Sequence, residues 1–201
     1  MRISDAIEQL ETIHEHLTKA EVYRGFAVPG VALVGVLGLL GAAAMDQVTG
    51  VSDPARFVRY WLLIAAVGAA LGLGTTAHSY LVREDEVARR KTRRVLAQFL
   101  PCLAAGGLVT AALLDAPPDM ISFLPGLWAI IFGLGMISAR PYLAKGVGFV
   151  GLGYVVAGGV LLARATNTSE LFGWQVGGVF GAGHLLTALV LWCDRPRDSN
   201  A

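Results

Sequence analysis

The stretch VREDEVARRKTRR, residues 82–94, separates two long apolar runs and decides how the chain is organised. Six of its thirteen residues are Lys or Arg, whereas residues 68–81 before it and 95–114 after it carry no charged side chain. A short basic segment between such runs is typical of a loop that a multi-span membrane protein keeps on one side of the bilayer. We therefore expect both flanking runs to be transmembrane helices.

The composition of the chain also indicates a membrane protein. Of the 201 residues, 55% are hydrophobic and only 15% are charged, whereas soluble domains carry about a quarter charged residues. The apolar residues lie in long runs, as expected for a polytopic membrane protein. The two cysteines, Cys102 and Cys193, are too few for a disulfide framework.

Six apolar runs reach the length of about 20 residues that a helix needs to cross a hydrocarbon core. They cover residues 26–45, 57–81, 95–114, 119–139, 143–163 and 171–192. Helices are expected because the backbone must satisfy its own polar groups within lipid, and a barrel would show alternating segments of about ten residues. The sequence thus predicts an all-α, six-span domain over residues 26–192 and a short tail over 193–201.

The basic residues predict the orientation of these spans. If the N-terminus is cytoplasmic, most of the 16 Lys and Arg residues fall on the cytoplasmic side. These are Arg2, Lys19, Arg24, Arg83, Arg89, Arg90, Lys91, Arg93, Arg94, Arg140, Lys145, Arg195 and Arg197. Only Arg56, Arg59 and Arg164 fall on the other side, so the positive-inside rule places both termini in the cytoplasm.

Setting this topology is the first role that we expect for residues 82–94. A second interpretation is a contact with anionic lipid or with a protein partner. The candidate contact residues are Arg83, Arg89, Arg90, Lys91, Arg93 and Arg94. Nucleic acid is not expected as a partner, because the segment is short and contains three acidic residues of its own.

Residues 1–25 are predicted to form an amphipathic helix on the cytoplasmic face. Its apolar residues recur at helical spacing; they are Ile3, Ile7, Leu10, Ile13 and Leu17. Its polar face is acidic, whereas a helix that binds anionic lipid would be basic. We therefore expect this helix to lie against protein, either the basic segment of the same chain or a separate partner.

The predicted spans contain most of the 25 glycines. Gly173, Gly177 and Gly181 lie four residues apart and share one helix face, a pattern that lets transmembrane helices approach closely. Packing within the chain is the first interpretation, and a homo-oligomer interface or a small cavity between thin helices are alternatives. The motifs GLG, FGLG and FGAG in the second, fourth and sixth spans hint at three repeated helical hairpins.

His184 is the most distinctive side chain in the spans. It lies about midway along the sixth span, where an ionisable residue is a functional candidate by default. With Gln175 it forms a candidate midplane polar site, and a structural hydrogen bond between helices is the alternative. A haem shared by His78 and His184 is disfavoured, because their depths differ by roughly 10 Å. No metal or other cofactor is expected.

A second polar group is a candidate cytoplasmic mouth. It comprises His78, Tyr80, Arg140, Tyr142 and Lys145. Arg140 and Lys145 are first interpreted as anchors whose charged ends extend to the membrane interface.

Several absences limit the function. No Asp or Glu lies within a predicted span apart from Asp115 and Asp119 at an outer loop, whereas ion-coupled transporters usually need a buried carboxylate. The sequence contains no P-loop, HExxH, GxSxG or CxxC motif. We therefore identify no catalytic residue and expect a protein that is not an enzyme.

Two stretches carry a resemblance to a known group of proteins. AHSYLVREDEVARRKTRRVLAQFLPC, residues 77–102, and LPGLWAIIFGLGMISARPYL, residues 124–143, resemble small, uncharacterised six-helix proteins of the bacterial inner membrane. The resemblance covers residues from about 23 to 192. It implies a six-helix layout and a bacterial inner-membrane location, and it implies no catalytic residue.

These observations lead to three functional hypotheses. The first is a non-enzymatic inner-membrane protein that acts through protein partners, as a scaffold, accessory subunit or sensor. Its contact surface would be the N-terminal helix together with residues 83–94. The second is a small-solute channel or carrier with a site near His184. A distant third is a redox subunit that binds haem or quinone.

Overall fold

The structure is a computed structural model that describes residues 28–49, 53–82 and 86–194. Within these ranges the chain is mostly helical and contains no strand, which confirms the predicted all-α class. Six of the helices are long and apolar enough to cross a membrane, and each predicted run overlaps one of them. The amphipathic helix predicted for residues 1–25, and the tail from residue 195 onward, lie outside the described residues.

The helices are joined by short connections. In chain order they are α2 (Val28–Thr49), α3 (Pro54–Val82), α4 (Glu86–Leu113), the short α5 (Pro118–Ile121), α6 (Leu124–Ala139), the 3-10 turn η1 (Arg140–Tyr142), α7 (Lys145–Ala165), the π-helical segment η2 (Trp174–Gly178) and α8 (Val179–Cys193). The sixth candidate span consists of η2 and α8 together.

The start of α3 is set by Asp53 and Pro54. The Asp53 carboxylate accepts hydrogen bonds from the backbone N–H of Ala55 at 2.9 Å and of Arg56 at 3.3 Å, so it caps helix donors that would otherwise lack a partner. Pro54 stands at the first helical position, where its missing N–H is tolerated. These two residues explain why the helix begins before the predicted apolar run.

The basic stretch that we expected to be a loop is largely helical. Between the end of α3 at Val82 and the start of α4 at Glu86 only residues 83–85 remain. Residues 86–100 contain no Gly or Pro and are rich in Ala, Arg and Leu, which are strong helix formers. The charged segment and the apolar span that follows it therefore form one continuous helix, α4.

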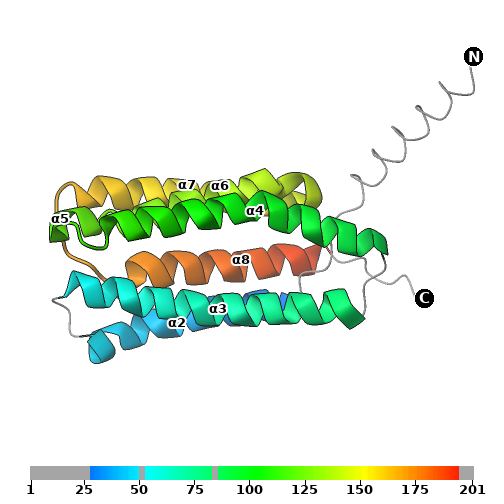
Figure 1. The fold of residues 1–201 in the computed structure, drawn as a ribbon, viewed down its shortest axis with the longest axis horizontal. Helices are drawn as coiled ribbons and strands as arrows, with labels where there is room; N and C mark the ends of the chain where they lie inside the picture. The colour runs from blue at the N-terminus through cyan, green and yellow to red at the C-terminus, as the bar shows by residue number, and fades with distance from the viewer. Residues whose placement is uncertain (1–27, 50–52, 83–85, 195–201) are drawn as a thin grey trace, which may run out of the picture.

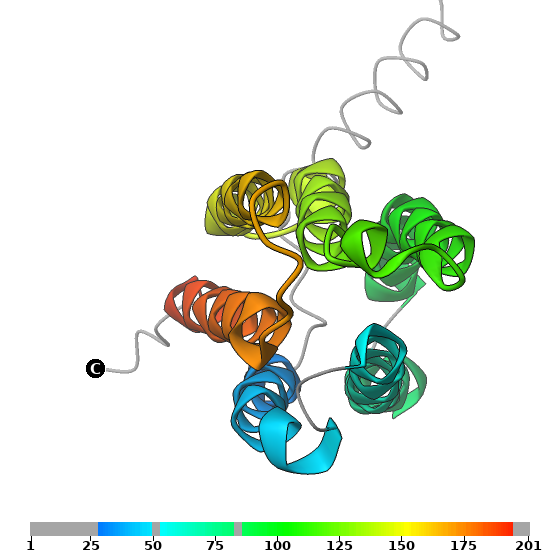
Figure 2. The same ribbon diagram turned by 90° about the vertical axis from the view of Figure 1, so that its left-hand side faces the viewer.

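The six long helices form an open ring. Around the ring the order is α3, α2, α8, α7, α6 and α4, and each neighbouring pair in this order is in contact (Figures 1 and 2). α3 and α4, at the two ends of this series, are consecutive in sequence but touch only sparsely. The hairpin partners α2–α3, α4–α6 and α7–α8 all pack together, while the sequence repeat among them stays a prediction.

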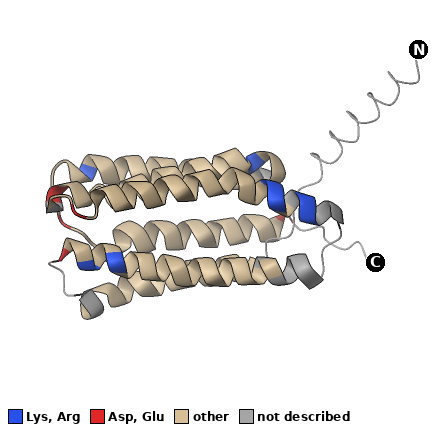
Figure 3. Ribbon diagram, in the orientation of Figure 1, with Lys and Arg blue, Asp and Glu red and all other residues tan. Residues whose placement is uncertain are grey.

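Charged side chains lie at the two ends of the bundle (Figure 3). We call the end with Arg90, Arg93, Arg94 and Arg140 the basic end. We call the end with Asp53, Asp115, Asp119 and Glu170 the acidic end; Arg56, Arg59 and Arg164 also lie there.

The closest contact in the bundle is between α6 and α7. A Cβ atom added to Gly126 would lie 2.8 Å from the carbonyl oxygen of Gly158, and one added to Gly158 would lie 2.7 Å from that of Gly126. Gly133 and Gly151 face each other in the same way. Because the backbones touch, half of the candidate span that contains α6 is buried, compared with 11% of the span in α4.

Two clusters of buried side chains make up the core. The cluster nearer the acidic end joins α2, α3, α5, α6, η2 and the loop before η2; its buried members are Met45, Phe57, Val58, Trp61, Ile121, Leu124, Leu171 and Val176. The cluster nearer the basic end joins α4, α6 and α7; its buried members are Val95, Ala129, Met136, Ala139, Leu143, Ala144, Val147 and Tyr154. Among the described side chains, none from α2 or α3 belongs to this second cluster. Among the described side chains, α2 and α3 therefore join the core through the cluster nearer the acidic end.

Candidate functional site

The polar group nearest the middle of the bundle is formed by α7 and α8. His184 Nδ1 lies 2.8 Å from the carbonyl oxygen of Phe180 and 3.1 Å from the hydroxyl of Tyr154. The Tyr154 hydroxyl also donates to the Phe180 carbonyl at 3.1 Å. Tyr154 is 2% exposed, and His184 is half-buried. A backbone carbonyl of α8 is thus shared by two side chains.

Gly183 makes this arrangement possible. The Tyr154 ring occupies the space where any side chain at position 183 would begin. The glycine of the FGAG motif therefore has a local purpose, because it lets an aromatic residue of α7 reach the backbone of α8.

The contacts of His184 favour one tautomer. A carbonyl oxygen only accepts, so we assign the ring hydrogen to Nδ1 from its 2.8 Å contact with Phe180. The neutral ring then keeps a lone pair on Nε2. No group of the described residues hydrogen-bonds this second nitrogen. His184 therefore offers one unused hydrogen-bond acceptor.

Two phenylalanine rings, Phe132 of α6 and Phe180 of α8, pack beside this polar group. The Phe132 ring centroid lies 5.4 Å from that of His184, 5.0 Å from that of Tyr154 and 5.3 Å from that of Phe180. Phe99 of α4 meets Phe132 edge-on at 5.1 Å. No charged residue belongs to this set, so the site provides no carboxylate for acid–base chemistry or cation binding.

Gln175 is not part of this group. Its amide oxygen accepts from the backbone N–H of Phe172 at 3.0 Å, and its amide nitrogen donates to the carbonyl of Glu170 at 3.2 Å. Nine positions before His184 in the sequence, it lies about 13 Å away at about 1.5 Å per residue. The structure therefore does not bring the two predicted midplane residues together, because Gln175 holds the loop before α8.

Of the candidate mouth residues, the structure describes the side chains of Arg140 and Tyr142 only. Both stand on η1 at the basic end, where Arg140 is exposed and Tyr142 is half-buried. The aliphatic part of Arg140 lies over Gly148 of α7, as expected of an anchor that extends past an apolar surface. The side chains of His78, Tyr80 and Lys145 lie outside the described set.

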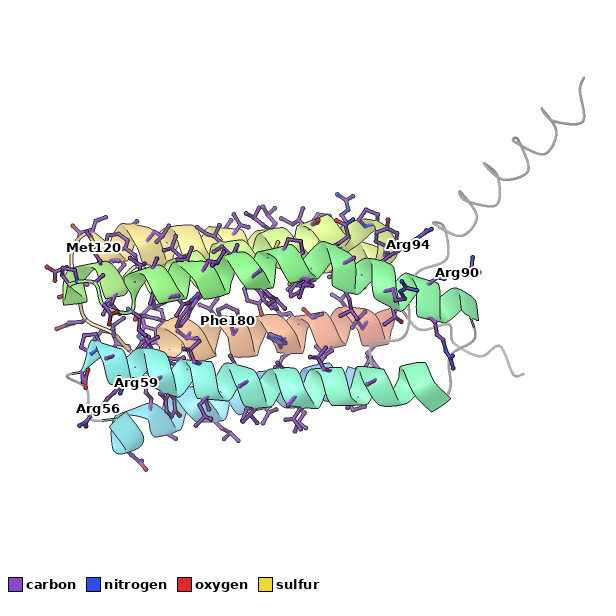
Figure 4. All side chains as sticks on the ribbon, in the orientation of Figure 1. Arg56, Arg59, Arg90, Arg94, Met120 and Phe180 are labelled. Atoms are coloured by element: carbon purple, nitrogen blue, oxygen red, sulfur yellow. The ribbon has the colours of Figure 1, made fainter. Side chains whose placement is uncertain are left out.

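The predicted contact residues of the basic segment lie on the first turns of α4. Arg90, Arg93 and Arg94 are exposed, and Arg89 is half-buried. Positions 90, 93 and 94 are three and four residues apart, so they share one face of the helix. Arg83 and the side chain of Lys91 lie outside the described set. Figure 4 shows Arg90 and Arg94 at one end of the bundle and Arg56 and Arg59 at the other.

The glycines predicted to mediate packing all face α2. Added Cβ atoms at Gly173, Gly177 and Gly181 would meet Ala42, Gly38 and Leu39. This face of η2 and α8 therefore packs within the chain, as the first interpretation of these glycines predicted.

The inner face of α4 is left uncovered. Phe99, Leu103 and Gly107 are four residues apart and share one helix face, and Phe99 of this face packs on Phe132. Leu103 is nevertheless 54% exposed, and a Cβ atom at Gly107 would meet nothing within 4 Å. α3, the other neighbour of α4 in the ring, touches it only sparsely, and Phe99 lies against Phe132, which contacts Phe180 and His184 of α8.

Tyr154 and the phenylalanines around it were missed at the level of sequence. Tyr154 is the one tyrosine in the interior of a predicted span, away from either end, and this was an available signal. Its pairing with His184 involves two helices, so no spacing along the chain could reveal it.

No site for a metal is found in the part of the chain that the structure describes. There, no three His, Cys, Asp or Glu residues lie close enough to hold an ion. No protein-family model, no curated protein and no solved structure matches this chain.

Proposed function

We propose that this chain is a non-enzymatic protein of a bacterial inner membrane that acts through a cytoplasmic protein partner, as an accessory subunit or sensor. Both termini, and the basic end of the bundle, would face the cytoplasm. The observation that carries the proposal is the continuity of α4, which begins at Glu86 and runs without a break into the apolar span.

The basic end of α4 is suited to bind an acidic partner. The candidate span begins at Thr92, so Arg90 lies just before it and Arg93 and Arg94 lie in its first turn, at the basic end of the helix. Because a helix already holds these side chains in one direction, binding would order few new backbone groups. A partner segment with two or three carboxylates at helical spacing would match this face.

The one-sided attachment of α4 favours a sensor over a passive anchor. Only 11% of its span is buried and it meets α3 sparsely, whereas it packs on α6 and contributes Val95 to the core. A change in the membrane part of α4 would therefore be transmitted along the continuous helix to its basic end. The channel or carrier alternative gains less support, since Phe99, Phe132 and Phe180 pack ring against ring beside His184.

The test is purification from the native membrane in mild detergent, with the associated proteins quantified by mass spectrometry. We expect a stoichiometric partner that Arg93→Gln with Arg94→Gln releases. Arg93→Lys with Arg94→Lys should keep the partner, because the charge remains. Arg56→Gln with Arg59→Gln removes two charges at the opposite end and should also keep it.

Two results would contradict the proposal. One is a protein that purifies alone, and the other is a partner that stays bound to the glutamine variant. Fusion reporters on the C-terminus should confirm that the glutamine variant keeps its topology, because basic residues also orient the spans.

A further inference from the structure

We propose that the protein binds a lipid-soluble phenol or hydroquinone between α3 and α4, through a hydrogen bond from the ligand hydroxyl to Nε2 of His184. The proposal goes beyond the partner function and does not depend on it. It concerns binding only and involves no electron transfer.

The first support is the unused acceptor of His184. Both hydrogen bonds of its ring converge on Nδ1, where Phe180 and Tyr154 hold the imidazole in one orientation. Nε2 contributes nothing to this structural role. An acceptor in apolar surroundings is destabilising unless a donor reaches it. The site therefore selects a ligand that donates a hydrogen bond.

The second support is the way into the bundle. Leu103 and Gly107 on the inner face of α4 are uncovered. On α3, Ala65 and Ala69 follow the buried Trp61 at four-residue steps, so the same face continues with small side chains, and both are exposed. Residues 60–75 and 95–113 carry no charge. Such walls admit a molecule from lipid and disfavour a charged solute.

The depth of these residues matches that of His184. Leu103 lies near the middle of the candidate span of α4, and Ala65 lies near the middle of that of α3. His184 has the same place in the sixth span. Toward the acidic end the core around Trp61 closes the bundle, so a ligand entering at this level would stop beside the histidine.

The third support is the aromatic wall. Phe132 lies at 38° to the imidazole and nearly perpendicular to Phe99. Rings in this arrangement favour a further aromatic ring in edge-to-face or offset contact. A phenolic head group combines this ring with a hydroxyl donor. A quinone has the ring but only accepts hydrogen bonds, so the reduced compound should bind and the oxidised compound should not.

The test uses duroquinol and duroquinone as a matched pair. The protein, labelled with 15N-histidine, is placed in phosphatidylcholine nanodiscs and examined by solid-state NMR. His14→Gln, His16→Gln and His78→Gln leave His184 as the one labelled ring. Without ligand, Nδ1 should be protonated and Nε2 unprotonated. Duroquinol, kept reduced without oxygen, should shift the Nε2 resonance, and duroquinone should not.

Two tryptophan variants test the route. Leu103→Trp fills the inner face of α4 and should weaken duroquinol binding about tenfold, because the indole takes space that the ligand would occupy. Leu189→Trp adds the same bulk on the opposite side of α8 from His184, where Leu189 is 53% exposed, and should change affinity by less than about threefold. His184→Phe should also weaken binding about tenfold.

Any of three results would overturn the proposal. They are a protonated Nε2 in the ligand-free protein, equal responses to duroquinol and duroquinone, and an equal loss of affinity in the two tryptophan variants. The NMR titration needs only the histidine reporter, so it decides the question even if His184→Phe fails to fold.

Discussion

Gly183 and Tyr154 show how one small residue defines the centre of this molecule. The tyrosine ring lies against the backbone of α8 at the point where glycine has no side chain. Its hydroxyl then joins the Phe180 carbonyl and the His184 ring. The absence of a side chain at Gly183 therefore allows Tyr154 to hold His184 in place.

The first prediction concerns this glycine. Gly183→Ala should lower the free energy of unfolding by about 1–3 kcal/mol, because the new methyl group overlaps the Tyr154 ring and forces a shift in packing. Gly159→Ala is the matched control, since a Cβ atom there meets nothing within 4 Å. Alanine also favours a helix over glycine, so the control should be neutral or more stable. Thermal unfolding in detergent would measure both, and equal losses would contradict the packing seen at Gly183.

Of the two residues of the predicted midplane site, His184 lies in the central polar group and Gln175 does not. His184 could be singled out from its type and its place in an apolar run. Gln175 is not ionisable and stands near the start of the predicted run 171–192, and its amide bonds the backbone of the preceding loop. Where the chain turns back decides that role, and side-chain type does not report it.

Among the elements, α4 differs most from the expectation. A run of arginines suggests a loop when only charge is considered, but arginine is also a strong helix former. The helix consequently continues from Glu86 to Leu113, so most of the predicted loop is helical. Pro101 stands inside this helix and removes one backbone hydrogen bond near its middle.

The second prediction follows from this structure of α4. Hydrogen–deuterium exchange in detergent should be faster in the middle of α4, around Pro101, than in the middle of α6, around Phe132. α6 touches α7 backbone to backbone, whereas most of α4 is exposed, and weakly packed segments open at lower free energy. Peptides from the two helices in one experiment serve as mutual controls. Equal protection would show that α4 is held as firmly as α6.

At the scale of the whole molecule, the distribution of core residues makes the ring asymmetric. The cluster around Trp61 ties both halves of the bundle together near the acidic end. Near the basic end the described core belongs to α4, α6, α7 and α8 alone. The described core is therefore asymmetric along the bundle, and α3 and α4 touch only sparsely.

The third prediction concerns the orientation of this ring. In a Cys102→Ser background, the exposed Cys193 at the basic end should react with a membrane-impermeant maleimide only when the cytoplasmic side is open. In the same background with Cys193→Ser, Ser169→Cys in the loop at the acidic end should react in intact spheroplasts, because positive charge stays inside. The reverse labelling pattern would show that the basic end faces outward, so the proposed partner surface would lie outside the cytoplasm.

The sequence by itself determined the class of this protein. Apolar runs of about 20 residues can satisfy their backbones only as helices, so the six helices and their order followed from composition along the chain. Only the tertiary structure decided which faces meet. The contact of Gly183 with Tyr154 joins two residues that are distant in sequence. The sparse contact between α3 and α4, in turn, keeps apart two helices that are consecutive in sequence. In a span that is apolar on every side, periodicity marks no buried face, so the partners of each helix depend on how small and large side chains fit together.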